Sequence, residues 1–401
     1  MRVLQLCIKP PYPPNEGGSL AMYAITRSLL GAGHQVKIIA ISSFKNPVEW
    51  NKIPQDFIDQ TGFESVHLDL KIKPQGILKS LFSRESYHVK RFISKELQCK
   101  IEKVLKKESY DIIHLESLFF TPYIPAIRKL TNAPIVLRSH NIEHRIWERS
   151  AMMTKKPAKR FILKHLASTL KNYELLHLND YQGILAITPA DAEFFRSQEC
   201  KVPIIDLPFG VDVKNYNTAS TCEQNSVGFI GALNWIPNLE GIEWFLKEVW
   251  PGVTQKQANA RFRIAGRTTP DWLQNTRMQG LEIVGEVDNA SDFISKNRIF
   301  VAPLLSGSGI RVKIIEALAL GKAVITTKVG AEGIKYTNEK NILIAHDANH
   351  YIQLIVDCLN NPALCKKIGN EGRHLVETEY NNQQLSYKLI AFYNQILNQT
   401  P

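Results

Sequence analysis

The sequence predicts an α/β protein of two domains, each a parallel sheet covered by helices on both faces. Its length of 401 residues exceeds what one hydrophobic core usually holds. Short apolar runs alternate with helical periodicity, which is typical of buried parallel strands joined by helices. The alternation restarts at Ser226–Ile230, so the second half of the chain repeats the architecture of the first.

The first half opens with the strand Val3–Ile8, which is apolar apart from Gln5. A loop rich in Pro and Gly follows, and Ser19 is expected to cap a helix that ends near Gly31. Segment Val48–His88 has no clear periodicity, and no element is assigned to it. The other expected strands are Val36–Ile41, Ile112–Leu115, Ile135–Leu137 and Ile184–Ile187, with helices at Ser94–Lys107 and Lys159–His177.

The second half follows Pro203–Asn225, which is interpreted as a linker because of its Pro and Asn residues. The expected strands are Ser226–Ile230, Phe262–Ala265, Ile283–Val284, Ile299–Ala302 and Ala323–Thr326, and the expected helices are Leu239–Val249, Val312–Leu320 and those from about Tyr351 onward.

Composition and charge narrow the class of protein. With 44% hydrophobic and 22% charged residues, the chain is neither disordered nor fibrous. The net charge of +11 is unevenly placed, since residues 1–200 carry 29 basic and 19 acidic side chains and residues 201–401 carry 20 and 19. A basic first domain suggests nucleic acid or an anionic membrane surface as a partner.

The cysteines and the apolar runs indicate the compartment. The six cysteines are scattered without a Cys-x-x-Cys pair, which favours reduced thiols and makes a zinc site unexpected. The first strand is too short for a secretory signal, and no apolar run reaches the ~18 residues of a spanning helix. We therefore expect a cytoplasmic protein, with any membrane contact peripheral and on the inner face.

The densest chemical signal is the run from Pro303 to Ala317, where a strand ends in a Gly/Ser loop that starts a helix. The loop contains Ser308 and Gly309, and two cations, Arg311 and Lys313, follow at the helix start. Free backbone N–H groups, the helix dipole and these cations favour a diphosphate. Glu316, about one turn further, could accept hydrogen bonds from a ribose diol. The alternative is a capped surface helix with solvated charges.

Four other loops follow predicted strands, the usual place for sites in open α/β sheets. Gly17 and Gly18 open the first helix, and Gly231 follows the first strand of the second half. His140 begins a polar run after Ile135–Leu137, and Glu332 lies in the Gly330–Gly333 loop. The alternative for the glycine loops is a simple turn, and the alternative for His140 is a histidine whose hydrogen bonds are made within its own loop. His114 lies within an apolar strand, where a structural role is favoured.

Taken together, these motifs resemble the retaining glycosyltransferases of family 4. The resemblance rests on the Gly-Gly loop, Ser-His-Asn-Ile-Glu-His-Arg at 139–145, Pro-Phe-Gly-Val-Asp at 208–212, and the run from Gly307 through Ile325. It implies the GT-B fold, with an N-terminal Rossmann-like acceptor-binding domain (1–205), a C-terminal Rossmann-like nucleotide-sugar-binding domain (206–380) and a C-terminal helix (381–401) that packs back on the first domain.

The resemblance also assigns roles. Glu316 matches the second Glu of the family's signature, which holds the ribose, whereas Ser308 replaces the first Glu, which touches the donor sugar. His140 matches the active-site histidine. Gly17 and Gly18 match the loop near the diphosphate and acceptor. The family's Arg and Lys phosphate ligands are missing after the first strand of the second domain, so Arg311 and Lys313 are expected to replace their charge.

The predicted function is therefore retaining, metal-independent transfer of a sugar from a nucleotide-diphosphate donor to a glycan or lipid-linked acceptor, in assembly of surface polysaccharide or lipopolysaccharide. No cofactor is expected beyond the donor substrate. Basic runs such as Lys100–Lys107 and Lys155–His165 suggest contact with an anionic membrane. The rivals are a GT-B nucleotide-sugar epimerase, a catalytically silent sugar-nucleotide binder, and a nucleic-acid-binding protein, for which no recognised motif is found.

Overall fold

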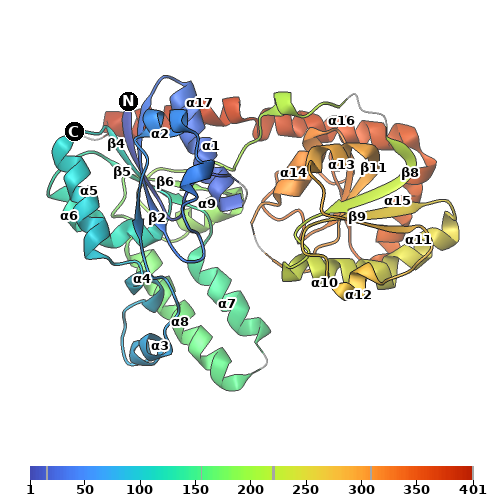
Figure 1. Cartoon of the computed structure of the whole chain (residues 1–401), viewed down its shortest axis with the longest axis horizontal. Coiled ribbons are helices and arrows are strands. Elements are labelled where there is room, and N and C mark those ends of the chain that lie inside the picture. Colours follow the sequence, from blue (N-terminus) through green and yellow to red (C-terminus); the bar gives the residue numbers. More distant parts are fainter. Residues whose placement is uncertain (15–16, 155, 219–221, 308, 400–401) are drawn as a thin grey trace. The chain divides into compact units, whose positions relative to one another are not determined.

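The computed structural model describes residues 1–14, 17–154, 156–218, 222–307 and 309–399. The chain forms two compact units (Figure 1). Unit 1 comprises Met1–Phe209 and the C-terminal residues from Leu385, and unit 2 comprises Gly210–Gln384. Within the described ranges, no helix combines the length and the apolar character needed to cross a membrane.

Unit 1 is built on a seven-stranded parallel sheet in the order β3-β2-β1-β4-β5-β6-β7. Strand β1 lies between β2 and β4, with Val3 opposite Val36 of β2 and Ile112 of β4. The strands are β1 (Arg2–Cys7), β2 (Gln35–Ser42), β3 (Glu64–His67), β4 (Ile112–Leu115), β5 (Ile135–Ser139), β6 (Gly183–Ala186) and β7 (Ile204–Asp206).

Helices cover both faces of this sheet, and two apolar clusters lie beneath them. Leu4 and Leu6 of β1 belong to one cluster, whereas Val3 and Cys7 belong to the other, as alternation along a strand requires. The helices are α1 (Gly17–Gly31), α2 (Gln55–Thr61), α3 (Pro74–Ser80), α4 (Tyr87–Lys90), α5 (Lys95–Lys107), α6 (Ile124–Arg128), α7 (Glu143–Met153), α8 (Pro157–Leu176) and α9 (Pro189–Arg196), with 3₁₀ turns η1 (Trp50–Lys52) and η2 (Leu118–Tyr123).

The C-terminal helix α17 (Asn382–Gln399) packs against the sheet of unit 1. Its buried side chains recur at helical spacing and join the cluster that contains Val3. These side chains are Leu385, Leu389, Phe392, Tyr393 and Ile396.

Unit 2 has a six-stranded parallel sheet in the order β10-β9-β8-β11-β12-β13. Its strands are β8 (Glu223–Ile230), β9 (Arg261–Ala265), β10 (Leu281–Gly285), β11 (Asn297–Ala302), β12 (Ala323–Thr327) and β13 (Leu343–Ala345). Its helices are α10 (Ile236–Trp244), α11 (Trp250–Lys256), α12 (Asp271–Gln274), α13 (Ala290–Lys296), α14 (Val312–Ala319), α15 (Ala348–Asn360) and α16 (Pro362–Glu379), with a 3₁₀ turn η3 (Val213–Asn215) and a π-helical segment η4 (Phe245–Val249).

The predicted α/β class with two parallel sheets is confirmed, and two local expectations are wrong. Residues Ile204–Asp206 form the edge strand β7 rather than part of a linker. Segment 48–88, to which the prediction assigned no element, contains η1, α2, β3, α3 and the start of α4. The helix expected to begin at Ser19 begins at Gly17, and the Ser19 hydroxyl donates instead to the Pro10 carbonyl (3.0 Å).

Candidate functional site

In unit 1, the start of α1 brings the Gly17–Gly18 loop against the residues that follow β1. A Cβ atom on Gly18 would lie 2.9 Å from Cε of Lys9, closer than real Cβ contacts come. A glycine therefore lets the Lys9 side chain lie against the N-terminus of a fifteen-residue helix. A cation at the positive end of a helix dipole favours an anion there. The sequence prediction included both glycines but not Lys9.

His140 follows β5 directly, at the carboxyl edge of the sheet. Its Nε2 lies 2.9 Å from Oε2 of Glu116, which follows β4, the neighbouring strand. The His140 side chain is 18% exposed and the Glu116 side chain is fully buried. The imidazole can therefore be reached from solvent, and the carboxylate that orients it cannot.

Glu116 is the centre of a buried polar network. Its Oε1 accepts a hydrogen bond from Nε2 of Gln5 (2.7 Å) and lies 3.2 Å from Nε2 of His114. Nη1 of Arg138 lies 3.7 Å from Oε2. On the far side of His114, Nδ1 lies 2.5 Å from the hydroxyl of Tyr393 in α17. The network thus connects three neighbouring strands with the C-terminal helix, and it includes His114, for which the sequence suggests only a structural role.

Burial and neighbouring charges determine the protonation states of Glu116 and His140. Burial alone would raise the pKa of Glu116, but its interactions with His114 and Arg138 and the hydrogen bond from His140 hold that pKa well below its usual range. Burial lowers the pKa of His140, and the carboxylate opposes this only in part. Near pH 7, a neutral imidazole therefore donates through Nε2 to an ionised Glu116, which leaves Nδ1 as an acceptor.

The rest of the polar run after β5 forms the N-terminus of α7. Glu174 of α8 accepts hydrogen bonds from the backbone N–H groups of Glu143 (3.1 Å) and His144 (3.3 Å) and pairs with the His144 ring (2.6 Å). Burial, followed by the charge of Glu174, raises the pKa of Glu143 to about 8. These contacts hold the start of α7 against α8. Within this polar run, His140 is the residue that contacts Glu116.

In unit 2, the loops after β8, β11 and β12 meet at one edge, because these three strands are neighbours in the sheet. Lys313, in the first turn of α14, donates to Oδ1 of Asn238 (2.6 Å), and Asn238 donates to the Ala232 carbonyl (2.8 Å). A Cβ atom on Gly231 would lie 2.7 Å from Nδ2 of Asn238 and 3.0 Å from Nζ of Lys313. A side chain at position 231 would therefore displace Asn238 or Lys313 from these positions.

Lys313 is held in a strongly desolvated position. Its Nζ lies 4.2 Å from the centroid of the Phe229 ring. Burial, and then the charge of Arg311, lowers the pKa of Lys313 to about 7. Lys313 is half-buried, and a partly desolvated ammonium is unfavourable without a counter-ion, so the site favours binding of an anion.

Arg311 immediately precedes α14 and is 5% exposed. Its Nη1 donates to the Gly309 carbonyl (2.8 Å), and its guanidinium lies 5.7 Å from the Trp235 ring centroid. Gly309 has a φ of +82°, a backbone conformation that residues other than glycine rarely adopt. Ser308 lies outside the described residues.

The two predicted carboxylates of unit 2 differ in their surroundings. Glu316 is part of α14, and its Oε1 accepts a hydrogen bond from the hydroxyl of Tyr216 (3.2 Å). Burial raises the pKa of Glu316. Glu332 lies in the turn after β12, where its backbone N–H donates to the Val329 carbonyl (3.3 Å).

The sequence prediction missed several residues of these clusters. Asn238 carried a weak signal, since it follows the Gly231 loop by a few residues. Lys9 and Glu116 also had a weak signal, since each directly follows a predicted strand. Tyr216 and Tyr393 come from elements remote in sequence and had no local signal. These missed residues are Lys9, Glu116, Tyr216, Asn238 and Tyr393.

The chain consists of two doubly wound units, each with polar loops at the carboxyl edge of its sheet. This is the GT-B fold, and solved GT-B structures align along nearly the whole chain. More particularly, residues 224–361, within unit 2, match the family described as "Glycosyl transferases group 1".

Similar proteins extend the comparison. An uncharacterized 44.6 kDa protein in the cps region of Klebsiella pneumoniae is 20% identical over 398 residues, covering 94% of this chain and 95% of that protein. The sucrose-phosphate synthase of Thermosynechococcus elongatus aligns with a TM-score of 0.67 and 16% identity, covering 100% of both chains. Anabaena HepE, solved in complex with UDP, aligns with a TM-score of 0.66 and 11% identity, covering 98% of this chain and 100% of its own.

Proposed function

We propose that this protein is a retaining glycosyltransferase, which moves a sugar from a nucleotide-diphosphate donor to a glycan or lipid-linked acceptor. We further propose that it works in the cytoplasm, at the inner face of the membrane, in the assembly of a surface polysaccharide or lipopolysaccharide. The match of residues 224–361 to the group 1 family and the cps-region description of the Klebsiella relative support this proposal. A TarM variant from S. aureus in complex with UDP and alpha-GlcNAc-glycerol (TM-score 0.67, 12% identity, 98% of this chain and 99% of its own) and HepE in complex with UDP-glucose (TM-score 0.64, 12% identity, 98% and 100%) are similar in fold.

The observation that carries the proposal is the half-buried Lys313 beside Gly231, at the N-terminus of α14. In the proposed reaction the bond between the anomeric carbon and the diphosphate breaks, and negative charge grows on the leaving phosphate. Preorganised cations and N–H groups at that position stabilise the charge more in the transition state than in the ground state. Lys313 and Arg311 supply this stabilisation, so the proposed reaction needs no metal ion.

The other residues of unit 2 fit the rest of the donor. Glu316, already hydrogen-bonded to Tyr216, lies one turn into α14 from Lys313 and is assigned to the ribose diol. Gly231 and Gly309 leave room for the phosphates, and Glu332, in the loop after the neighbouring strand, is assigned to the sugar. Serine at position 308 leaves the identity of that sugar open.

In unit 1, His140 and the Gly17–Gly18 loop are assigned to the reacting groups. The neutral imidazole, fixed by Glu116 through Nε2, offers Nδ1 to a hydroxyl. In the retaining reaction the acceptor hydroxyl attacks from the face that the diphosphate leaves, and its proton passes to the departing phosphate. His140 is then a positioning and hydrogen-bonding group, so its protonation state does not change during turnover.

The test begins with a thermal-shift screen of UDP-, GDP- and ADP-sugars, because a ligand that binds the native state raises its melting temperature. Sugar transfer from the donor found is then measured with glycan and lipid-linked acceptors. Arg311→Ala and Lys313→Ala should each lower turnover by about a hundredfold. Lys247→Ala, a highly exposed lysine of the same unit, is the matched control and should be fully active.

Full activity in both site variants would refute the assignment of the diphosphate site. Conversion of the donor into another nucleotide sugar without an acceptor would instead identify an epimerase.

A further inference from the structure

A cavity lies in unit 1, lined mostly by residues of segment 48–88, which lacks clear periodicity. It measures about 410 Å³ and is lined by residues between Asp69 and Arg91. Helices α3 and α4 belong to this segment, and they pack beside α8 (Figure 1). Nε2 of His165 in α8 lies 2.8 Å from the Ser80 carbonyl at the end of α3, which ties the two helices together.

The cavity is strongly cationic. Five cations line it, against two carboxylates: Lys71, Lys73, Lys79, Lys90 and Arg91, against Asp69 and Glu85. Each carboxylate already pairs with a lysine, since Lys73–Asp69 and Lys90–Glu85 are both 2.9 Å apart. Three cations are therefore in excess, and such a surplus around one cavity favours an anionic ligand.

Arg91 and Tyr87 form the fixed part of the wall. Nη1 of Arg91 donates to the Leu70 carbonyl (2.8 Å), and its guanidinium lies 5.6 Å from the Tyr87 ring centroid. Nε of Arg91 is buried and has no hydrogen-bond acceptor among the residues that the structure describes. The Tyr87 hydroxyl accepts from the Lys73 backbone N–H (2.8 Å). The wall of the cavity thus contains the Arg91 guanidinium, whose Nε–H donor has no acceptor among the described residues.

Large apolar side chains are exposed in the same segment as the residues that line this cavity. Phe82 is 89% exposed and Leu78 is 60% exposed, and both lie in or just after α3, beside Lys79. The end of α7 and the start of α8 have the same character and lie beyond the same end of the sheet (Figure 1). The exposed apolar residues there are Met152, Met153 and Phe161, and the exposed cations are Lys156, Lys159 and Arg160.

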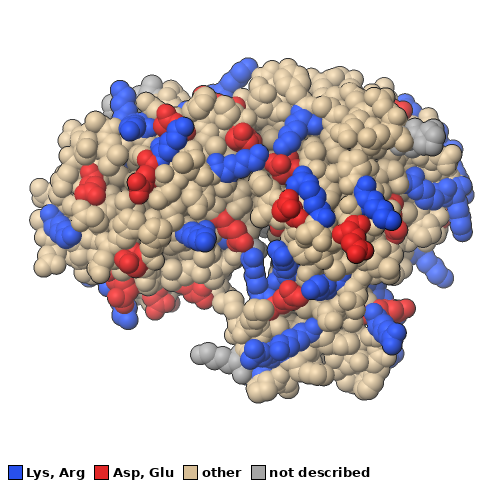
Figure 2. Space-filling model, turned by 180° about the vertical axis from the view of Figure 1, so that it is seen from behind, with Lys and Arg blue, Asp and Glu red and all other residues tan. Residues whose placement is uncertain are grey.

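We propose that the cavity binds the phosphate head group of an anionic phospholipid, while Leu78 and Phe82 enter the acyl layer. Exposed aromatic and aliphatic side chains next to cations are the features with which proteins bind an anionic bilayer surface. Figure 2 shows Lys and Arg side chains beside uncharged surface on the lobe that contains α3, α7 and α8. The proposal extends the proposed function, because a lipid-linked acceptor lies at such a surface, but lipid binding requires no turnover.

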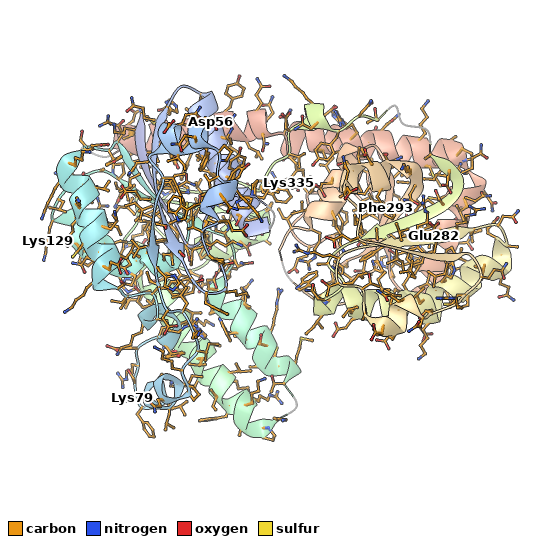
Figure 3. All side chains as sticks on the ribbon, viewed as in Figure 1. Asp56, Lys79, Lys129, Glu282, Phe293 and Lys335 are labelled. Atoms are coloured by element: carbon orange, nitrogen blue, oxygen red, sulfur yellow. The ribbon has the colours of Figure 1, made fainter. Side chains whose placement is uncertain are left out.

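The experiment is flotation of the full chain with vesicles of phosphatidylcholine alone and with phosphatidylglycerol added. Binding is expected only with the anionic lipid. Lys79→Glu should weaken it by about tenfold or more, since each cation near the surface contributes about 1 kcal/mol. Phe82→Ser should weaken it by about tenfold through lost apolar burial. Lys129→Glu is the matched control, because Lys129 is an exposed lysine of the same unit at the end of α6, away from α3 (Figure 3).

Three results would overturn the proposal. The first is absence of binding to anionic vesicles, including the case in which glycerol 3-phosphate alone binds at Lys79. The second is equal weakening by Lys129→Glu and Lys79→Glu, which would mean that total charge, not this cavity, binds the lipid. The third is full binding by Lys79→Glu and the milder Lys79→Gln. Donor-induced thermal shifts are measured on the same samples, so loss of flotation with intact donor binding refutes the lipid site and leaves the proposed transferase standing.

Discussion

The depressed pKa of Lys313 predicts that donor binding weakens as the pH rises above neutrality. The folded, ligand-free protein holds this side chain mostly neutral between its pKa of about 7 and the ordinary value of 10.5. A diphosphate favours the ammonium form, so binding in this pH range takes up a proton. The affinity is therefore insensitive to pH below about 7 and falls above it.

The size of the effect follows from the protonated fraction. About half of the Lys313 side chains are protonated at pH 7 and about one in thirty at pH 8.5, so the affinity should fall by about fifteenfold over this range. The effect on stability has the opposite sign. Between about pH 7 and 10.5 the unfolded chain binds more protons at this lysine than the native protein does, so its unfavourable contribution shrinks as the pH rises.

The assay is isothermal titration calorimetry with the nucleotide sugar found in the screen, at several pH values and in buffers of different ionisation enthalpy. Proton uptake approaching one per donor is expected at pH 8.5. Lys313→Met should bind weakly at every pH, with no proton uptake, and should melt no lower than the wild type, because a buried ammonium is itself unfavourable. Lys247→Met is the control. Equal affinities at pH 7 and pH 8.5 with the wild-type protein would refute the reasoning.

The remaining predictions concern the fit of the two clusters. Gly231→Ala places a Cβ 2.7 Å from Nδ2 of Asn238, so donor affinity should fall by about tenfold or more while the melting temperature changes little; unchanged affinity in calorimetry would contradict the close fit. Tyr393→Phe removes the hydroxyl beside Nδ1 of His114 and should lower the free energy of unfolding by about 1–3 kcal/mol in urea titrations. The carboxylate of Glu116 is buried and has a low pKa, so wild-type stability should decline as the pH falls through that pKa. Glu116→Gln removes this carboxylate, and the melting temperature of the variant should lack the decline. The same loss of melting temperature at acid pH in both proteins would count against the network.

Much of the fold could be predicted because its signals are local. Strand β4 has the predicted bounds, and β1, β2, β5 and β6 differ from the prediction by a few residues, since buried parallel strands read as continuous apolar runs. Helix α5 ends at Lys107 as predicted, and Ser94 caps it by accepting from the Leu97 N–H. The short strands β3, β7 and β13 were missed. Three or four residues at or near a sheet edge carry little periodicity, and pairing with a neighbour decides their conformation.

The residues of the candidate site also fall into those that the sequence reveals and those that only the fold reveals. Glycines and cations within one loop, such as Gly309, Arg311 and Lys313, are visible in the sequence because loop, helix start and charge follow each other in order. Glu116 and Tyr393 are not, because the hydrogen bond between Gln5 and Glu116 spans 111 positions and that between His114 and Tyr393 spans 279. Such contacts depend on the strand order and on the packing of α17, and both arise only when the chain is folded.

The sequence by itself thus determined a chain of two parallel α/β units with polar, glycine-containing loops after their strands, since periodicity and turn chemistry act over a few residues. Only the tertiary structure decided which charges are buried and what they meet: His140 against Glu116, Lys313 against Asn238, and the cations around the cavity of residues 69–91. The physical reason is that desolvation and charge–charge interactions depend on distance in space, and folding brings together groups that are far apart along the chain.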